Sequence, residues 1–283
     1  MPVVAALAVQ MTLHLAAQGA APAALPGTAR AAAPYDITGY WVSEVTEKWR
    51  YRMLVPDKND YQQVPLNPEG RKLASAWDPA RDQASGEACK SYGAAALLQV
   101  PGRLHITWQD DSTLRLDTDS GTQTRLFRFA LPQGQGAPGE SRGSGPALAT
   151  ATPSWQGQSA AMWGGGEPRD RRDGQGGPTQ DSTGRLVVTQ AQRMEPDYLK
   201  VVTTRMRPGY LQKNGVPYSA DALLEEYFDT FSDPYTRNTW LVVTTVVTDP
   251  RYLIEPLIMH AHFKKLPDAS GWDPTPCRAD EPR

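Results

Sequence analysis

Two histidines stand two residues apart near the C-terminus, His260 and His262, in the apolar stretch LIMHAHFKK at 257–265. Residues two apart on a β-strand project from the same face, so both rings can point together toward one site. A metal site normally needs a third protein ligand, and His105 is the only other histidine beyond residue 33. The spacing allows a three-histidine metal site. The alternative is that these rings line a cavity or its opening as hydrogen-bonding groups, and we expect neither a metal nor another cofactor.

The segment TEKWRYRM at 46–53 places Arg50 and Arg52 two residues apart among aromatic residues. On a strand, both arginines would share one face, opposite to the face of Glu47. Two such guanidinium groups can bind an anionic or carbonyl-bearing molecule through paired hydrogen bonds. If buried, they need a carboxylate partner, for which Glu225, Glu226 or a ligand would serve. The alternative is a stripe of arginines facing solvent.

A tyrosine follows the turn-forming pair Asn214–Gly215, at Tyr218. Tyrosine and histidine can pass a proton as general acid and base in an isomerase, hydratase or lyase that needs no cofactor. The candidates for this chemistry are His105 and His262 as base, Tyr218 and Glu47 as acid, and Arg50 and Arg125 as partners for developing negative charge. The alternative for a loop tyrosine is a packing role.

The sequence lacks the motifs of several common enzyme mechanisms. It has no Gly-rich phosphate loop, no Gly-x-Ser-x-Gly elbow and no HExxH. The formal net charge of -2, from 29 basic and 31 acidic residues, lacks the basic excess that nucleic-acid binding requires. Eight tryptophans and eleven tyrosines can line an apolar cavity or simply fill a core. Our candidates for contacting a small molecule are Arg50, Arg52, Trp108, Arg125 and Tyr227.

The N-terminus has the pattern of a secretory signal peptide over residues 1–33. An uncharged apolar run from Val3 to Ala17 precedes small residues that end in three alanines at 31–33. A membrane anchor would need about 18 to 20 uninterrupted apolar residues, and Gln10 and His14 interrupt this run. We therefore expect export to the periplasm or out of the cell, with no integral membrane span.

Only two cysteines occur, Cys89 and Cys277, and each follows a Trp-Asp-Pro triplet. In an exported chain, an even number of cysteines suggests a disulfide, here one that ties the C-terminal tail to the body. Two unpaired thiols remain the alternative.

The remaining pattern is that of a β protein. Alternating or β-branched runs are separated by turn-forming residues, and only one segment has helix signals, with Asn67 as cap and Pro68 at the first position. The expected strands cover 37–55, 96–109, 112–118, 122–131, 154–163, 185–192, 198–206, 223–231, 239–247 and 257–265. We predict an all-β fold: one domain over 34–283 that forms an antiparallel up-and-down barrel of about ten strands with one short helix. Gly-rich loops are expected near 132–153 and 164–184.

Several strings resemble a group of uncharacterised exported bacterial proteins. They are TGYWVSEVTEKWRYRM, the segment from WDPARDQ to TRLFRF, GYLQKNGVPYSADALLEEYFDTF and WDPTPC. The resemblance covers nearly all of the chain after Pro34 except the Gly-rich loops, and it implies export and a lipocalin-like architecture without implying an activity.

Three functional hypotheses follow. The first is an exported barrel that binds an apolar or aromatic small molecule in its lumen. The second is the cofactor-independent isomerase, hydratase or lyase described above, acting on such a molecule. The third is an envelope interaction module that uses the strand surface, with a protein partner that the sequence does not identify.

Overall fold

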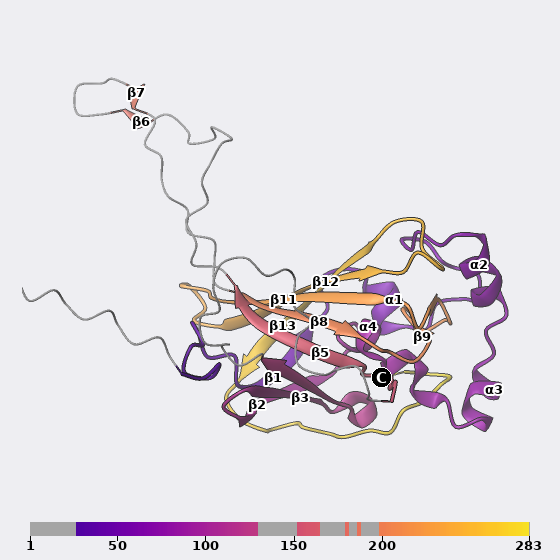
Figure 1. The fold of residues 1–283 in the computed structure, drawn as a ribbon, viewed down its shortest axis with the longest axis horizontal. Helices are drawn as coiled ribbons and strands as arrows, with labels where there is room; N and C mark the ends of the chain where they lie inside the picture. The colour runs from indigo at the N-terminus through magenta and orange to yellow at the C-terminus, as the bar shows by residue number, and fades with distance from the viewer. Residues whose placement is uncertain (1–26, 130–151, 165–178, 181–185, 188–197, 283) are drawn as a thin grey trace, which may run out of the picture.

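The computed structural model describes residues 27–129, 152–164, 179–180, 186–187 and 198–282, and nine of its strands close into one barrel (Figure 1). Their order around the barrel is β1-β13-β12-β11-β8-β5-β4-β3-β2. The strands are β1 (Gly39–Glu44), β2 (Arg103–Asp110), β3 (Thr113–Thr118), β4 (Thr124–Phe129), β5 (Gln158–Gly164), β8 (Tyr198–Thr204), β11 (Leu223–Ser232), β12 (Thr239–Thr248) and β13 (Leu257–Leu266). Two small two-stranded sheets pair β9 (Gly209–Tyr210) with β10 (Pro217–Tyr218), and β6 (Thr179–Gln180) with β7 (Leu186–Val187). The predicted all-β barrel is confirmed.

The barrel is mixed, whereas the sequence predicted purely antiparallel pairing. β4 and β5 are parallel, with Phe127 opposite Ser159, and every other neighbouring pair in the barrel is antiparallel. An up-and-down barrel requires a hairpin at each connection. Here β4 and β5 begin at the same end of the barrel and run in the same direction, so the connection between them is not a hairpin.

Alternating residues of the strands fill the lumen. In β13, Met259, Ala261 and Phe263 are buried, while the residues between them are partly exposed. The main core contains Trp41, Leu104, Ile106, Leu114, Leu116, Phe127, Phe129, Leu199, Val201, Phe228, Leu241, Val243, Ala261 and Phe263. Most of the barrel interior is therefore packed protein.

Helices gather at one end of the barrel, which we name the capped end (Figure 1). They are α1 (Trp49–Met53), α2 (Pro68–Ser75), α3 (Pro79–Ala84), the 3₁₀-helix η1 (Ala88–Tyr92) and α4 (Ala94–Leu97), while the 3₁₀ turn η2 (Ser120–Thr122) joins β3 to β4. A second core joins Ala74 and Ala94 to strand residues Leu224, Val247 and Met259. The predicted helix is confirmed as α2, and the other helices correct the expectation of only one.

The predicted start of α2 has the expected chemistry. The Asn67 side chain accepts a hydrogen bond from the Gly70 amide at 2.9 Å, and Pro68 occupies the first turn. Asn67 also donates to the Arg251 carbonyl at 2.8 Å, which fastens the helix to the β12–β13 connection. A local sequence signal thus fixes both the helix start and a long-range contact.

The segment before β1 covers the opposite end of the barrel. The Trp163 indole donates to the Ala29 carbonyl at 2.8 Å, and the Tyr35 hydroxyl donates to the Phe228 carbonyl at 2.7 Å. Residues 27–33, which the sequence assigns to the leader, therefore lie against the barrel. Residues 1–26 are outside the described part of the chain.

Two predicted strands are confirmed only in part, because a portion of each is helical in the structure. β1 ends at Glu44, and Lys48 adopts a left-handed conformation (φ 51°) that starts α1. Residues two apart on a helix point to nearly opposite sides, so Arg50 and Arg52 do not share a face. The expected strand over 96–109 begins only at Arg103, because the alanine-rich residues near its start favour helix and Pro101 interrupts the run. The predicted Gly-rich loops and the strand over 185–192 fall mostly outside the described residues.

A disulfide joins Cys89 to Cys277, across a sequence separation of 188 residues. It confirms the predicted pairing and ties the C-terminal tail to η1. Structural disulfides persist in oxidising compartments, so the bond indicates a non-cytoplasmic environment. Within the described ranges, we find no helix with the length and apolar character needed to cross a membrane.

Candidate ligand-binding site

The paired histidines of β13 lie on the outer face of the barrel. His262 Nδ1 lies 2.8 Å from Thr46 Oγ1, and His260 Nδ1 lies 3.2 Å from Thr244 Oγ1. Their neighbour Ala261 is buried and faces the lumen. In both rings, Nδ1 is therefore engaged by a nearby threonine hydroxyl outside the lumen.

His105 lies elsewhere on the outer surface. Its ring stacks on Tyr40, with a centroid distance of 4.0 Å and an interplanar angle of 1°, and Trp272 approaches edge-on at 6.1 Å. On β1, Tyr40 pairs with His105, and Glu44 pairs with His262. Tyr40 and Glu44 are four residues apart, so the two histidines lie beside positions separated by roughly 13 Å along the strand. The structure does not bring the three histidines together, and the described residues contain no cluster of metal-ligating side chains.

The predicted acid and base are also separated. Tyr218 is fully buried in the second core, and burial raises its pKa. Within the described part of the chain, its hydroxyl has no hydrogen-bond partner. Glu47 lies just before α1, and one of its carboxylate oxygens is buried without a hydrogen-bond partner in the described ranges. Because His105 and His262 project outward, the barrel wall separates both rings from Tyr218.

Two aromatic candidates for ligand contact lie far from the capped end or outside the barrel. Trp108 packs with Phe129 and Trp163, at centroid distances of 5.6 and 6.4 Å, near the end opposite the helices. Tyr227 lies on the outer face of β11, with the Lys200 ammonium 5.2 Å from its ring centroid. The two side chains do not form one site.

Arg125 points into the lumen, where Glu226 is its partner. Arg125 Nη1 donates to Glu226 Oε1 at 2.8 Å, and Nη2 donates to the second carboxylate oxygen and to Thr203 Oγ1. Ser159 Oγ lies 2.7 Å from the Thr203 hydroxyl. The carboxylate expected to pair with Arg50 or Arg52 is therefore occupied by Arg125, and this polar group helps to fill the lumen.

A pocket lies at the capped end, beneath α1, and we name it the α1 pocket. Its lining comes from five separate parts of the chain. The lining residues are Lys48, Tyr51, Arg52, Val64, Ser91, Ala96, Gln99, Val100, Leu211, Gln212, Lys213, Leu257 and Met259. Leu257 and Met259 are inward-facing residues at the start of β13, so the pocket adjoins the end of the lumen. About 30 Å³ is open to the centre of a water molecule, which is room for roughly two waters.

Arg52 supplies a buried charge to this pocket. Its side chain is 2% exposed, and its Nε donates to the Gln99 carbonyl at 3.1 Å. The Gln99 side chain in turn donates to the His260 carbonyl at 3.2 Å. The terminal nitrogens Nη1 and Nη2 of Arg52 are buried and have no hydrogen-bond partner among the residues that the structure describes. Burial lowers the pKa of Arg52, and the charge of Glu47 opposes this effect.

Other polar groups of the α1 pocket add to its positive character. Burial lowers the pKa of Lys48, because the ammonium loses water on folding. Lys213 is 6% exposed, and the buried side-chain oxygen of Gln212 has no hydrogen-bond partner among the described residues. The sequence identified Arg52 from its neighbours in 46–53 but missed these residues, since no local pattern connects 211–213 with α1.

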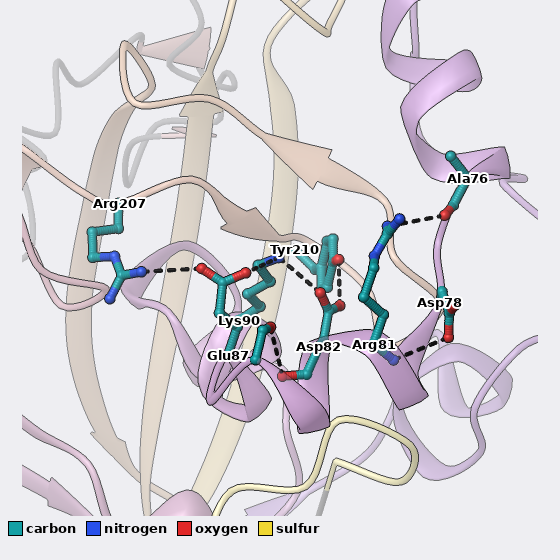
Figure 2. A network of polar contacts seen from close by, with 9 residues as sticks. Ala76, Asp78, Arg81, Asp82, Glu87, Lys90, Arg207 and Tyr210 are labelled. Carbon is teal, nitrogen blue, oxygen red and sulfur yellow. Dashed lines mark hydrogen bonds and ion pairs between the residues drawn. The ribbon is translucent and has the colours of Figure 1, made fainter.

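A second polar cluster lies at the same end, between α3, η1 and β9 (Figure 2). Asp82 is buried and accepts hydrogen bonds from Tyr210 at 2.6 Å and from Lys90 at 2.8 Å. Glu87 pairs with Lys90 at 2.5 Å and with Arg207 at 3.2 Å. Each carboxylate here has a cationic partner, so the cluster fastens η1 to β9 and offers no open ligand position.

Comparisons of the chain with protein-family models, with curated proteins and with solved structures found no match.

Proposed function

We propose that this protein binds an apolar or aromatic small molecule in the α1 pocket, at the capped end of the barrel lumen. The observation that carries the proposal is the composition of this pocket. Its walls are mainly apolar, with Val64, Leu211, Leu257 and Met259, and a few polar groups converge on it. Small-molecule sites commonly have this combination.

Binding in this pocket requires movement of its cover. The space that the structure leaves suits only a very small group, so a larger guest needs the pocket to widen in a way that keeps Arg52 bonded to the Gln99 carbonyl. α1 has five residues, and no side chain caps its N-terminus. The residue before it, Lys48, has a left-handed backbone conformation. A helix of little more than one turn has little stability of its own, so the contacts of Tyr51 with Asp60 and of Arg52 with Gln99 determine the cost of moving it.

The positions of the candidate residues favour binding over catalysis. A cofactor-independent lyase or isomerase needs an acid and a base within reach of one substrate atom. The barrel wall separates Tyr218 from both candidate histidines, which weakens that hypothesis. We further propose that the protein works in the periplasm or outside the cell, a setting supported by its disulfide and by its signal-like N-terminus.

Filling the pocket tests the proposal. Ala96 lines it and is 4% exposed, so Ala96→Phe should occupy the guest space. We expect N-phenyl-1-naphthylamine, an uncharged fluorescent probe, to bind the unmodified protein and to bind this variant at least about tenfold more weakly. The matched control is Ala160→Phe, because Ala160 is exposed on the outer face of β5.

Ala96→Val fills less space and keeps the test valid if the phenylalanine variant does not fold. Equal probe affinity in Ala96→Val, Ala160→Phe and the unmodified protein would place the probe elsewhere. Absence of probe binding to the unmodified protein would contradict the proposal directly.

A further inference from the structure

Arg52 carries a buried charge whose two terminal nitrogens have no partner within the described structure. Removing a charge from water is costly unless hydrogen bonds and an opposite charge replace the lost hydration. Glu47 acts on Arg52 through its charge, but no hydrogen bond or ion pair joins the two among the described residues. The guanidinium of Arg52 at the α1 pocket therefore lacks hydrogen-bond acceptors for Nη1 and Nη2 among the described residues.

The orientation of the guanidinium determines which edge is available. Nε is occupied by the Gln99 carbonyl, and this bond fixes the plane of the group. Nη1 and Nη2 remain as two donors at the far end. A carboxylate can accept from both at once, in the paired geometry for which arginine is suited.

The rest of the pocket limits the kind of anion. Lys48 and Lys213 add positive charge near Arg52, and Glu47 removes part of it. The remaining wall is mostly apolar, with Val64, Leu211 and Met259 among its residues. Burying a dianion such as phosphate against this wall costs more than burying a single charge, so the lining favours a monoanion with an apolar body.

We propose that the α1 pocket binds the carboxylate of an apolar or aromatic carboxylic acid end-on to Nη1 and Nη2 of Arg52. The apolar body of the acid lies against the aliphatic wall. This inference rests on the function proposed above and adds the chemical class of the ligand, with Arg52 as the residue that determines specificity.

The test compares benzoate with benzamide, which has nearly the same shape and no charge. Isothermal titration calorimetry should show that the unmodified protein binds benzoate at least about tenfold more tightly than benzamide, because hydrogen bonds to charged groups are the stronger ones. Arg52→Gln should remove this difference and leave benzamide affinity unchanged. The matched control is Arg50→Gln on the same helix, since Arg50 is half-exposed and pairs with Asp60 at 2.6 Å.

Further ligands distinguish the possible sources of the anion. Acetate and inorganic phosphate, titrated in the same buffer, should bind more weakly than benzoate, because acetate lacks the apolar body and phosphate carries more charge. If either binds as tightly as benzoate, the site is one for small anions in general and this inference is wrong.

The two proposals fail in different ways. Equal affinity for benzoate and benzamide, with both lost in Ala96→Phe, leaves the binding function in place and overturns the role of Arg52. If the uncharged probe and both aromatic ligands fail to bind, the binding function itself is contradicted. The benzoate–benzamide contrast in the unmodified protein decides the matter even if Arg52→Gln does not fold.

Discussion

Arg125 and Glu226 form a buried ion pair within the barrel, although their strands are not neighbours. β4 carries Arg125, β11 carries Glu226, and β5 and β8 lie between them in the wall. Thr203 and Ser159, one from each intervening strand, complete the hydrogen-bonded group. Both charged side chains are at most 1% exposed. The pair therefore joins one side of the barrel from within.

Breaking this pair should destabilise the fold strongly. Glu226→Gln leaves the guanidinium without its counter-charge in the lumen, and we expect a loss of about 3 to 5 kcal/mol in the free energy of unfolding. Urea denaturation monitored by tryptophan fluorescence measures this loss. The control is Glu225→Gln, which breaks the partly exposed Lys200–Glu225 pair on the opposite face of β11 and should cost less than about 1 kcal/mol. Similar losses in the two variants would contradict a special role for the buried pair.

Gly215 occupies a position that no other residue fits. Its φ is +82°, and a Cβ atom there would lie 2.2 Å from Cγ of Trp77. Gly86 has a similar φ of +75° but open space around it. Gly215→Ala should therefore destabilise the protein by at least about 1 kcal/mol more than Gly86→Ala, because both variants bear the backbone strain and only the first bears the clash. Thermal denaturation compares them, and equal melting temperatures would show that Trp77 moves aside without cost.

The disulfide should contribute substantially to stability because it closes a long loop. Cys89 and Cys277 are 188 residues apart, and chain-entropy arguments give about 5 kcal/mol for a loop of this length. We expect Cys277→Ser to lower the free energy of unfolding by up to this amount. Limited proteolysis should also cut the variant in its C-terminal tail. A reductant should reproduce both effects in the unmodified protein and change nothing in Cys277→Ser.

Stability should fall at high pH through Tyr210. Burial and the hydrogen bond to Asp82 raise the pKa of this phenol above its ordinary value of 10.0, because both disfavour the phenolate. The folded state keeps the proton that the unfolded chain releases. The contribution of Tyr210 is thus fully present below about pH 10 and decreases as the pH rises further. Urea denaturation between pH 8 and 11 should give a shallower decline for Tyr210→Phe than for the unmodified protein, and parallel curves would exclude this linkage.

Local periodicity was sufficient to predict much of the barrel. The alternation in LIMHAHFKK predicts a strand over 257–265, and β13 is found at Leu257–Leu266. The Asn67-Pro68 signal correctly predicts the start of α2. Both predictions succeed because the interactions involved, side-chain alternation and N-capping, lie within a few residues of the chain. Alternation also places His260 and His262 on one face, but it does not say whether that face is inside or outside.

The same local reasoning failed at 46–53. An aromatic and arginine-rich run resembles a strand, yet Lys48 turns the chain into α1 over the end of the barrel. This conversion buries Arg52 and leaves Arg50 half-exposed, so two residues that the sequence treats alike have different surroundings. Packing of α1 against the capped end, a long-range effect, outweighs the weak strand preference of the segment.

The sequence by itself determined the β-rich class, the start of α2 and a pair of cysteines suited to a disulfide, because these depend on short-range pattern and on the number of cysteines. Only the tertiary structure decided which charges are buried together and where space remains for a guest. The α1 pocket combines residues near positions 50, 64, 95, 212 and 258, and Arg125 meets Glu226 from 101 residues away. Such contacts arise when the barrel closes and the helices cover its end. The burial that results determines which polar groups lose water and therefore need a partner.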